Sequence, residues 1–148
     1  MKKKIIIGIS IAVVIIGIVI GLVILNNPKK VIVKSITEYT LGRTESHGSL
    51  IYTNGNVYKF NGNKKEKKTT IPPEELTQIK EYIKQTENKT EYHEYKSHWH
   101  SENPNITTIS IYQNNQPIIL YSGSDVGITK NTSECTDALE ALINKYIY

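Results

Sequence analysis

Cysteine is almost absent from this sequence, since Cys135 is the only one in 148 residues. A single cysteine excludes a disulfide within the chain and a zinc site built from several thiolates. Long hydrophobic runs are also scarce. The one run near the N-terminus excludes a protein that crosses the bilayer several times. Glycine-rich phosphate-binding loops and nucleophile motifs of recognised spacing are missing too, so no motif identifies a catalytic residue.

The body of the chain lacks an excess of either charge. The whole sequence has 18 basic and 14 acidic residues. Five of the lysines flank the hydrophobic run: Lys2, Lys3, Lys4, Lys29 and Lys30. Without them, residues 31–148 hold 13 basic and 14 acidic residues, a net charge of −1. We therefore expect no nucleic-acid partner, because nucleic-acid-binding domains carry a clear positive excess.

The hydrophobic run covers residues 5–25, which are 21 consecutive residues without a charge. As a helix this segment is about 31 Å long, which matches a hydrocarbon core of about 30 Å. The run therefore predicts a transmembrane helix whose partner is the lipid bilayer. We divide the chain into a short basic tail (residues 1–4), the anchor (residues 5–25), a linker (residues 26–30) and a body (residues 31–148).

The anchor differs from a cleaved signal peptide in two respects. It is longer than the usual h-region of about 7–15 residues, and no small-residue cleavage site follows it. Cleavage stays open as the alternative. Lysines lie on both sides of the run, and its place at the start of the chain favours a cytoplasmic N-terminus. We expect a single-pass protein of the cell membrane with its body outside the cytoplasm.

Gly17 and Gly21 form a GxxxG pair within the anchor. Such pairs let two membrane helices approach closely, so a weak homodimer through these glycines is one interpretation. Glycine is also frequent in membrane helices in general, which is the alternative.

The body alternates strand and turn patterns with two amphipathic helices. We expect strands at residues 31–41, 49–52, 57–60, 91–100, 106–112 and 117–121. Asn54-Gly55 favours a type I′ hairpin turn, and the charged residues 64–68 are interpreted as a turn. A helix is expected from Pro72 to near Asn88, with Leu76, Ile79 and Ile83 on one face.

The last helix is expected to begin at Asn131, because Asn131 and Glu134 have the spacing of a capping box. Its apolar face would comprise Ala138, Leu139, Leu142, Ile143 and Tyr146. Residues 123–130 are interpreted as a loop. The sequence thus predicts an α+β body in two layers, with three strands, a helix, three strands and a helix (βββαβββα). The sheet would be antiparallel, with both helices over one face.

One cluster has metal-binding character. In a strand, His98, His100 and Glu102 would share one face, and imidazole with carboxylate suits Zn²⁺ or Cu²⁺. His93, Tyr95 and Trp99 would face the other way. The alternative is a polar edge strand with its aromatic residues turned to the core.

Lysines 64, 65, 67 and 68 could contact anionic headgroups, although a lysine-rich segment is ordinarily solvated. With no catalytic constellation in view, we expect no enzyme, no catalytic residue and no cofactor. The expected function is a non-enzymatic module that binds an unknown protein or envelope partner. A metal-binding protein that uses His98 and His100 is the second hypothesis.

Overall fold

The structure is a computed structural model that describes residues 30–39, 46–95, 105–124 and 126–148. The predicted anchor at residues 5–25 lies outside the described residues, as do Gly17 and Gly21. Within the described part of the chain, no helix is long and apolar enough to cross a membrane. The fold is therefore that of the body.

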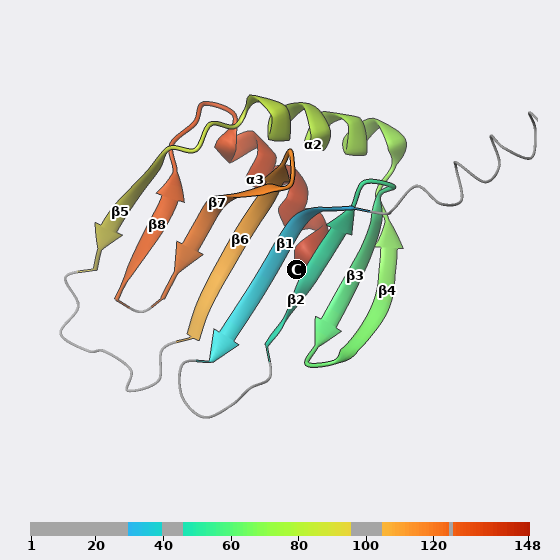
Figure 1. Cartoon of the computed structure of the whole chain (residues 1–148), viewed down its shortest axis with the longest axis horizontal. Coiled ribbons are helices and arrows are strands. Elements are labelled where there is room, and N and C mark those ends of the chain that lie inside the picture. The colour runs from blue at the N-terminus through green and yellow to red at the C-terminus, as the bar shows by residue number, and fades with distance from the viewer. Residues whose placement is uncertain (1–29, 40–45, 96–104, 125) are drawn as a thin grey trace, which may run out of the picture.

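Eight strands and two helices make up the described residues (Figure 1). In chain order they are β1 (Val31–Tyr39), β2 (His47–Tyr52), β3 (Asn56–Asn61), β4 (Lys64–Thr70), α2 (Pro73–Gln85), β5 (Thr90–Glu94), β6 (Asn105–Gln113), β7 (Gln116–Gly123), β8 (Gly127–Asn131) and α3 (Thr136–Ile147). The strands form one sheet in the order β4-β3-β2-β1-β6-β7-β8-β5. All neighbouring strands are antiparallel.

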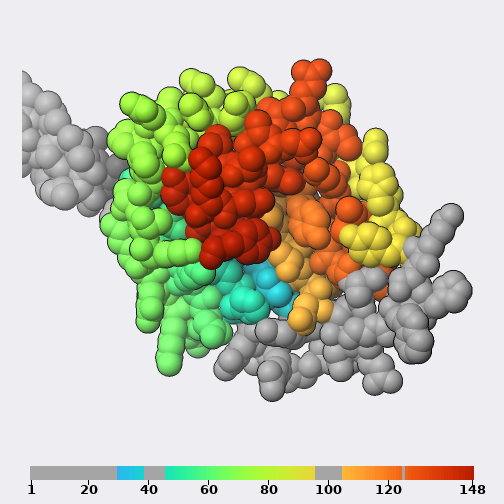
Figure 2. Space-filling model, turned by 180° about the vertical axis from the view of Figure 1, so that it is seen from behind, coloured from blue at the N-terminus to red at the C-terminus, as the bar shows by residue number. Residues whose placement is uncertain are grey.

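Helix α3 lies against one face of this sheet, which we call the covered face, and α2 runs across the ends of the strands beside α3 (Figure 1). In the view from behind, α3 covers the centre of this face and α2 lies along its upper edge (Figure 2). We call the opposite side the open face. Val33 of β1 pairs with Ile51 on one side and Ile111 on the other, and all three are fully buried on the covered face. Each such side chain contributes roughly 1.5–3 kcal/mol by burial.

Helix α2 begins where the sequence predicts. Pro73 occupies its first turn, where the missing N–H costs nothing, and Glu74 and Glu75 lie at the positive end of its dipole. Ile79 and Ile83 are buried as expected. The helix ends at Gln85, before the predicted Asn88, because Thr86 caps it with an Oγ1–H donated to the Tyr82 carbonyl at 2.8 Å.

Helix α3 begins later than the capping-box pattern predicts, at Thr136. Asn131 instead ends β8, and its Oδ1 accepts hydrogen bonds from the Ser133 N–H and the Thr136 hydroxyl, both at 2.9 Å. The buried stripe consists of Leu139, Ile143 and Ile147. Leu142 and Tyr146 are partly buried, whereas Ala138 is exposed, which corrects the predicted apolar face at that position.

The turn between β2 and β3 is not the type I′ turn expected at Asn54-Gly55. Gly55 has a positive φ of 81° but Asn54 does not, so Asn54-Gly55 is no type I′ turn. The Gly55 N–H donates to the Tyr52 carbonyl at 2.8 Å, which gives a longer loop with glycine in the left-handed position. Two positive φ angles occur instead at Asn114 and Asn115, between β6 and β7.

The predicted strand count is wrong in two places. Residues 64–68, interpreted as a charged turn, belong to β4, and residues 127–130, interpreted as loop, belong to β8. Strand β4 is an edge strand paired only with β3, and all of its residues are exposed, so it needs no apolar alternation. Strand β8 pairs with β7 and β5, and these pairings rather than a local pattern define it. The α+β class, the antiparallel sheet and the presence of two helices are confirmed, but the order is ββββαββββα.

Candidate functional site

A polar groove of about 740 Å³ lies on the covered face, beside the C-terminal end of α3. Its floor follows from the strand register. One row crosses four strands through Thr37, His47, Asn61 and Lys64. The next row crosses the same strands through Ser35, Ser49, Lys59 and Glu66. Because residues two apart in a strand share a face, eight polar side chains from four strands converge there.

Helix α3 forms the other wall of the groove through Ile147 and Tyr148. The end of this helix is fixed to the sheet. The buried Ser49 hydroxyl donates to the Ile147 carbonyl at 3.0 Å. Lys59 and Lys68 both donate to the Tyr148 main-chain oxygen, at 3.1 and 3.0 Å. These donors satisfy carbonyl groups that a helix end leaves without an intrahelical partner.

The groove is positively charged on the β3–β4 side. Lys59 and Lys64 line it, and Lys68 lies beside Lys59. Desolvation, and then the adjacent Lys59, lower the pKa of the Lys68 ammonium. Glu66 has the one acidic side chain among the lining residues. The arrangement offers hydroxyl, amide, imidazole and ammonium groups, which suit a hydroxyl-rich ligand with negative charge.

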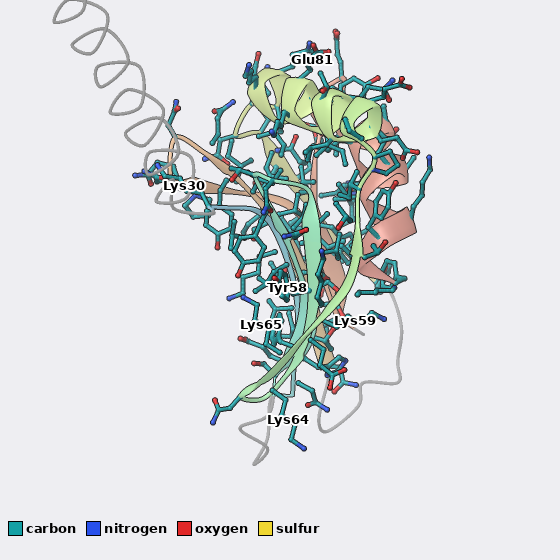
Figure 3. The ribbon with its side chains drawn as sticks, turned by 90° about the vertical axis from the view of Figure 1, so that its right-hand side faces the viewer. Lys30, Tyr58, Lys59, Lys64, Lys65 and Glu81 are labelled. Atoms are coloured by element: carbon teal, nitrogen blue, oxygen red, sulfur yellow. The ribbon has the colours of Figure 1, made fainter. Side chains whose placement is uncertain are left out.

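A second cluster lies on the open face of the same strands. Tyr52 and Tyr58 meet edge to face, with ring centroids 5.4 Å apart and planes at 75°. The Lys65 ammonium lies 4.6 Å from the Tyr52 centroid and 4.8 Å from the Tyr58 centroid, and donates to the Tyr52 hydroxyl. Figure 3 shows Tyr58 and Lys65 on one side of the sheet and Lys59 on the other. This cluster fixes β4 against β2 and β3.

The predicted metal ligands His98, His100 and Glu102 lie outside the described residues, as does Trp99. The described chain contains no group of three or more side chains placed to hold a metal ion. His93 lies in β5, with its Nε2 3.8 Å from Glu91 Oε2. Strand β5 is an edge strand, but Tyr92 and Tyr95 are 62% and 44% exposed, so these aromatic residues do not turn to the core.

Lys64 of β4 lies at the end of the sheet opposite to the end at which the chain enters it. The row through Thr37 ends at Lys64, and Thr37 is near the far end of β1 from Lys30. Figure 3 places Lys30 and Lys64 at opposite ends of the strands.

Glu140 of α3 is an acidic residue that is not fully solvated. It is only partly exposed, and its Oε1 is buried with no hydrogen-bond partner among the described residues. Burial raises the pKa of this carboxyl, as does Asp137 to a smaller extent, while Lys130 lowers it. Lys130 itself donates to Asp137 at 2.8 Å.

No local sequence motif indicates the groove, although the sequence holds one signal of it. Each of the four strands carries a pair of polar residues two positions apart, such as Ser35 and Thr37 in β1, where a core strand would carry apolar ones. Comparison of the chain with protein-family models, curated proteins and solved structures gave no significant match.

Proposed function

We propose that this chain is a single-pass membrane protein whose body, residues 31–148, is a non-enzymatic binding module. Residues 5–25 span the cell membrane, with the N-terminus in the cytoplasm and the body outside it. The support for the anchor is the 21-residue run without a charge and the lysines that flank it. The single observation that supports a binding role is the polar groove beside the end of α3.

The ligand proposed for the groove is an oligosaccharide that carries carboxylate groups. Its hydroxyls would exchange hydrogen bonds with the side chains of Thr37, His47 and Asn61, and its carboxylates would meet Lys64. A volume of about 740 Å³ lies within the range of roughly 300–1,000 Å³ that small-molecule sites occupy. Such sugars are components of cell envelopes, which agrees with a body outside the cytoplasm.

Titration of the full chain in detergent with trigalacturonic acid tests the ligand, with maltotriose as its neutral counterpart. We expect calorimetric binding of the acidic sugar and a loss of roughly tenfold to a hundredfold in affinity for Lys64→Gln, since one charge-assisted hydrogen bond is worth roughly 1.5–3 kcal/mol. Lys84→Gln, on the exposed side of α2, is the control and should bind normally. An affinity that is unchanged in Lys64→Gln, or the absence of binding by the unaltered chain, contradicts the proposal.

Alkaline carbonate washing of membranes tests the anchor. The full chain should stay in the pellet, whereas a variant with Ile15→Asp and Val19→Asp should be released, because a charge in mid-span costs roughly 2.5–3.5 kcal/mol. Release of the unaltered chain would remove the anchor from the proposal. A crosslinked dimer that disappears in Gly17→Ile would support pairing through Gly17 and Gly21.

A metal-binding function is the second candidate, and it stands on the sequence pattern of His98, His100 and Glu102 alone. Zinc titration of the full chain should give calorimetric heat at micromolar metal if the site forms. The heat should vanish in the double variant His98→Ala and His100→Ala. No heat in the unaltered chain rejects this candidate and leaves the sugar-binding proposal untouched.

A further inference from the structure

The two edges of the sheet differ in charge. All residues of β4 and of β5 are exposed, and within the described chain no strand pairs with their outer sides. Strand β4, KKEKKTT, has four lysines and one glutamate. Strand β5, TEYHE, has two glutamates and no lysine. Copies of one edge therefore repel each other, whereas the two different edges attract.

The strand directions also suit pairing between unlike edges. Eight strands that are all antiparallel to their neighbours leave the first and last strands running in opposite directions. Figure 1 shows β4 and β5 with opposed arrows. A second copy shifted sideways, without rotation, thus brings its β5 antiparallel to β4 of the first. The all-antiparallel pattern of the sheet would continue across the junction.

The hydrogen-bonding groups of both edges point outward at matching positions. Thr132 N–H donates to the Lys89 carbonyl and Tyr95 N–H to the Val126 carbonyl. Because bonded residues alternate along an antiparallel ladder, the main-chain groups of Tyr92 and Glu94 face away from β8. On β4, Asn61 and Lys64 close a two-residue hairpin loop, so the same alternation turns Lys65 and Lys67 outward.

We propose that copies of this chain associate edge to edge, with β4 of one copy pairing antiparallel with β5 of the next. One register satisfies the charges and the outward groups together. It sets Glu94 opposite Lys65, His93 opposite Glu66, Tyr92 opposite Lys67 and Glu91 opposite Lys68. A shift of two residues toward Lys64 would instead set Glu91 opposite Glu66, which places like charges in contact. A shift of two residues the other way would set Glu91 opposite Thr70, which loses one of the two pairs of opposite charge.

This contact is heterologous, because it joins two different surfaces of the same molecule. Each added copy presents a free β4 at one end and a free β5 at the other, so the assembly has no closed size and grows as a row. The proposal concerns the sheet edges and is independent of the groove and its ligand.

Cysteine crosslinking of the full chain, purified in mild detergent on a Cys135→Ser background, tests the register. His93→Cys with Glu66→Cys places two thiols directly opposite across the junction, about 4.5 Å apart at Cα. Oxidation should give a ladder of trimers and larger species on a non-reducing gel. The control pairs His93→Cys with Lys67→Cys, which lie on opposite faces and should give at least tenfold less ladder.

Charge exchange tests the recognition. Glu94→Lys should reduce the ladder several-fold, and Lys65→Glu added to it should restore the ladder, because the pair is then opposite in charge again. High salt should weaken the ladder, since the screening length falls from about 10 Å at ~0.1 M to about 3 Å at ~1 M. Thermal unfolding by circular dichroism must match among all variants, which limits any difference to association. No species beyond a dimer, or equal ladders in matched and control pairs, overturns the proposal.

Discussion

Gly48 is a sensitive position because the β1 backbone occupies the space that a side chain there would need. Gly48 of β2 pairs with Ile36 of β1. A Cβ built on Gly48 would lie 1.9 Å from the Ser35 carbonyl oxygen and 2.9 Å from Cζ of Phe60, whose ring covers the glycine. An ordinary contact needs at least about 3.4 Å. Gly48→Ala therefore requires the β1 and β2 backbones to separate by more than an ångström.

The free-energy cost of this separation follows from the main-chain hydrogen bonds between β1 and β2. It lengthens the main-chain hydrogen bonds on either side, each worth roughly 1 kcal/mol, and adds overpacking strain of roughly 1–3 kcal/mol. We expect Gly48→Ala to lower the free energy of unfolding by about 3–5 kcal/mol. For a body of this size the melting temperature should fall by roughly 10–20 °C.

Gly123→Ala is the matched control. There the added Cβ meets the hydroxyl and ring atoms of Tyr121, at 2.2 and 2.6 Å for the two nearest. These atoms are the far end of a side chain, which can turn away, so the loss should stay below about 1 kcal/mol. Denaturant unfolding of both variants measures the difference. Equal losses, or an unaltered stability for Gly48→Ala, would refute the reasoning from backbone contact.

Three further changes probe the core and the helix ends. Asn131→Ala removes three hydrogen bonds of a side chain that is only 2% exposed, including a 2.8 Å bond to the Glu87 carbonyl. Chemical denaturation should show a loss of about 2–4 kcal/mol in the free energy of unfolding. The control Asn144→Ala, at an exposed position, should lose less than about 0.5 kcal/mol. Leu139→Ala should cost about 2–5 kcal/mol by the same assay, since Leu139 is fully buried. Burial raises the folded pKa of Glu140 above its ordinary 4.5, so folding favours the protonated form and stability falls as pH rises through that folded pKa. Glu140→Gln should therefore raise the melting temperature at neutral pH, and this gain should shrink below pH 4.5; a gain that is independent of pH would contradict the assignment.

The parts of the fold that were predictable from the sequence are those with a local physical cause. Pro73 and the two glutamates after it mark the start of α2 because proline and acidic residues suit a helix N-terminus. The end of β3 at Asn61 follows from the Asn-Gly pair there, and Gly62 indeed has a positive φ of 55°. Each of these signals lies within a few residues of the feature that it predicts.

Strand β4 shows why a local pattern can fail. KKEKKTT has no apolar alternation, and a run of lysines ordinarily indicates a solvated turn. It forms a strand because the turn after Asn61 leads directly back along β3, where six residue pairs align. Lys65 then lies over the Tyr52 and Tyr58 rings. The stabilising partners come from neighbouring strands, so the segment itself carries no apolar signal.

The groove depends on pairings that no local pattern contains. Its position requires β1 to lie at the centre of the sheet, between β2 and a strand 70 residues further along, where the Thr37 and Thr107 hydroxyls meet at 3.0 Å. Once β1 is central, the register alone brings His47, Asn61 and Lys64 into one row with Thr37. A slip of one residue in any of these pairs would turn that strand's polar residues to the open face and its apolar ones out of the core. The burial of Val33, Ile51 and Val57 therefore fixes the groove: the same register that closes the core sets the polar rows at its end.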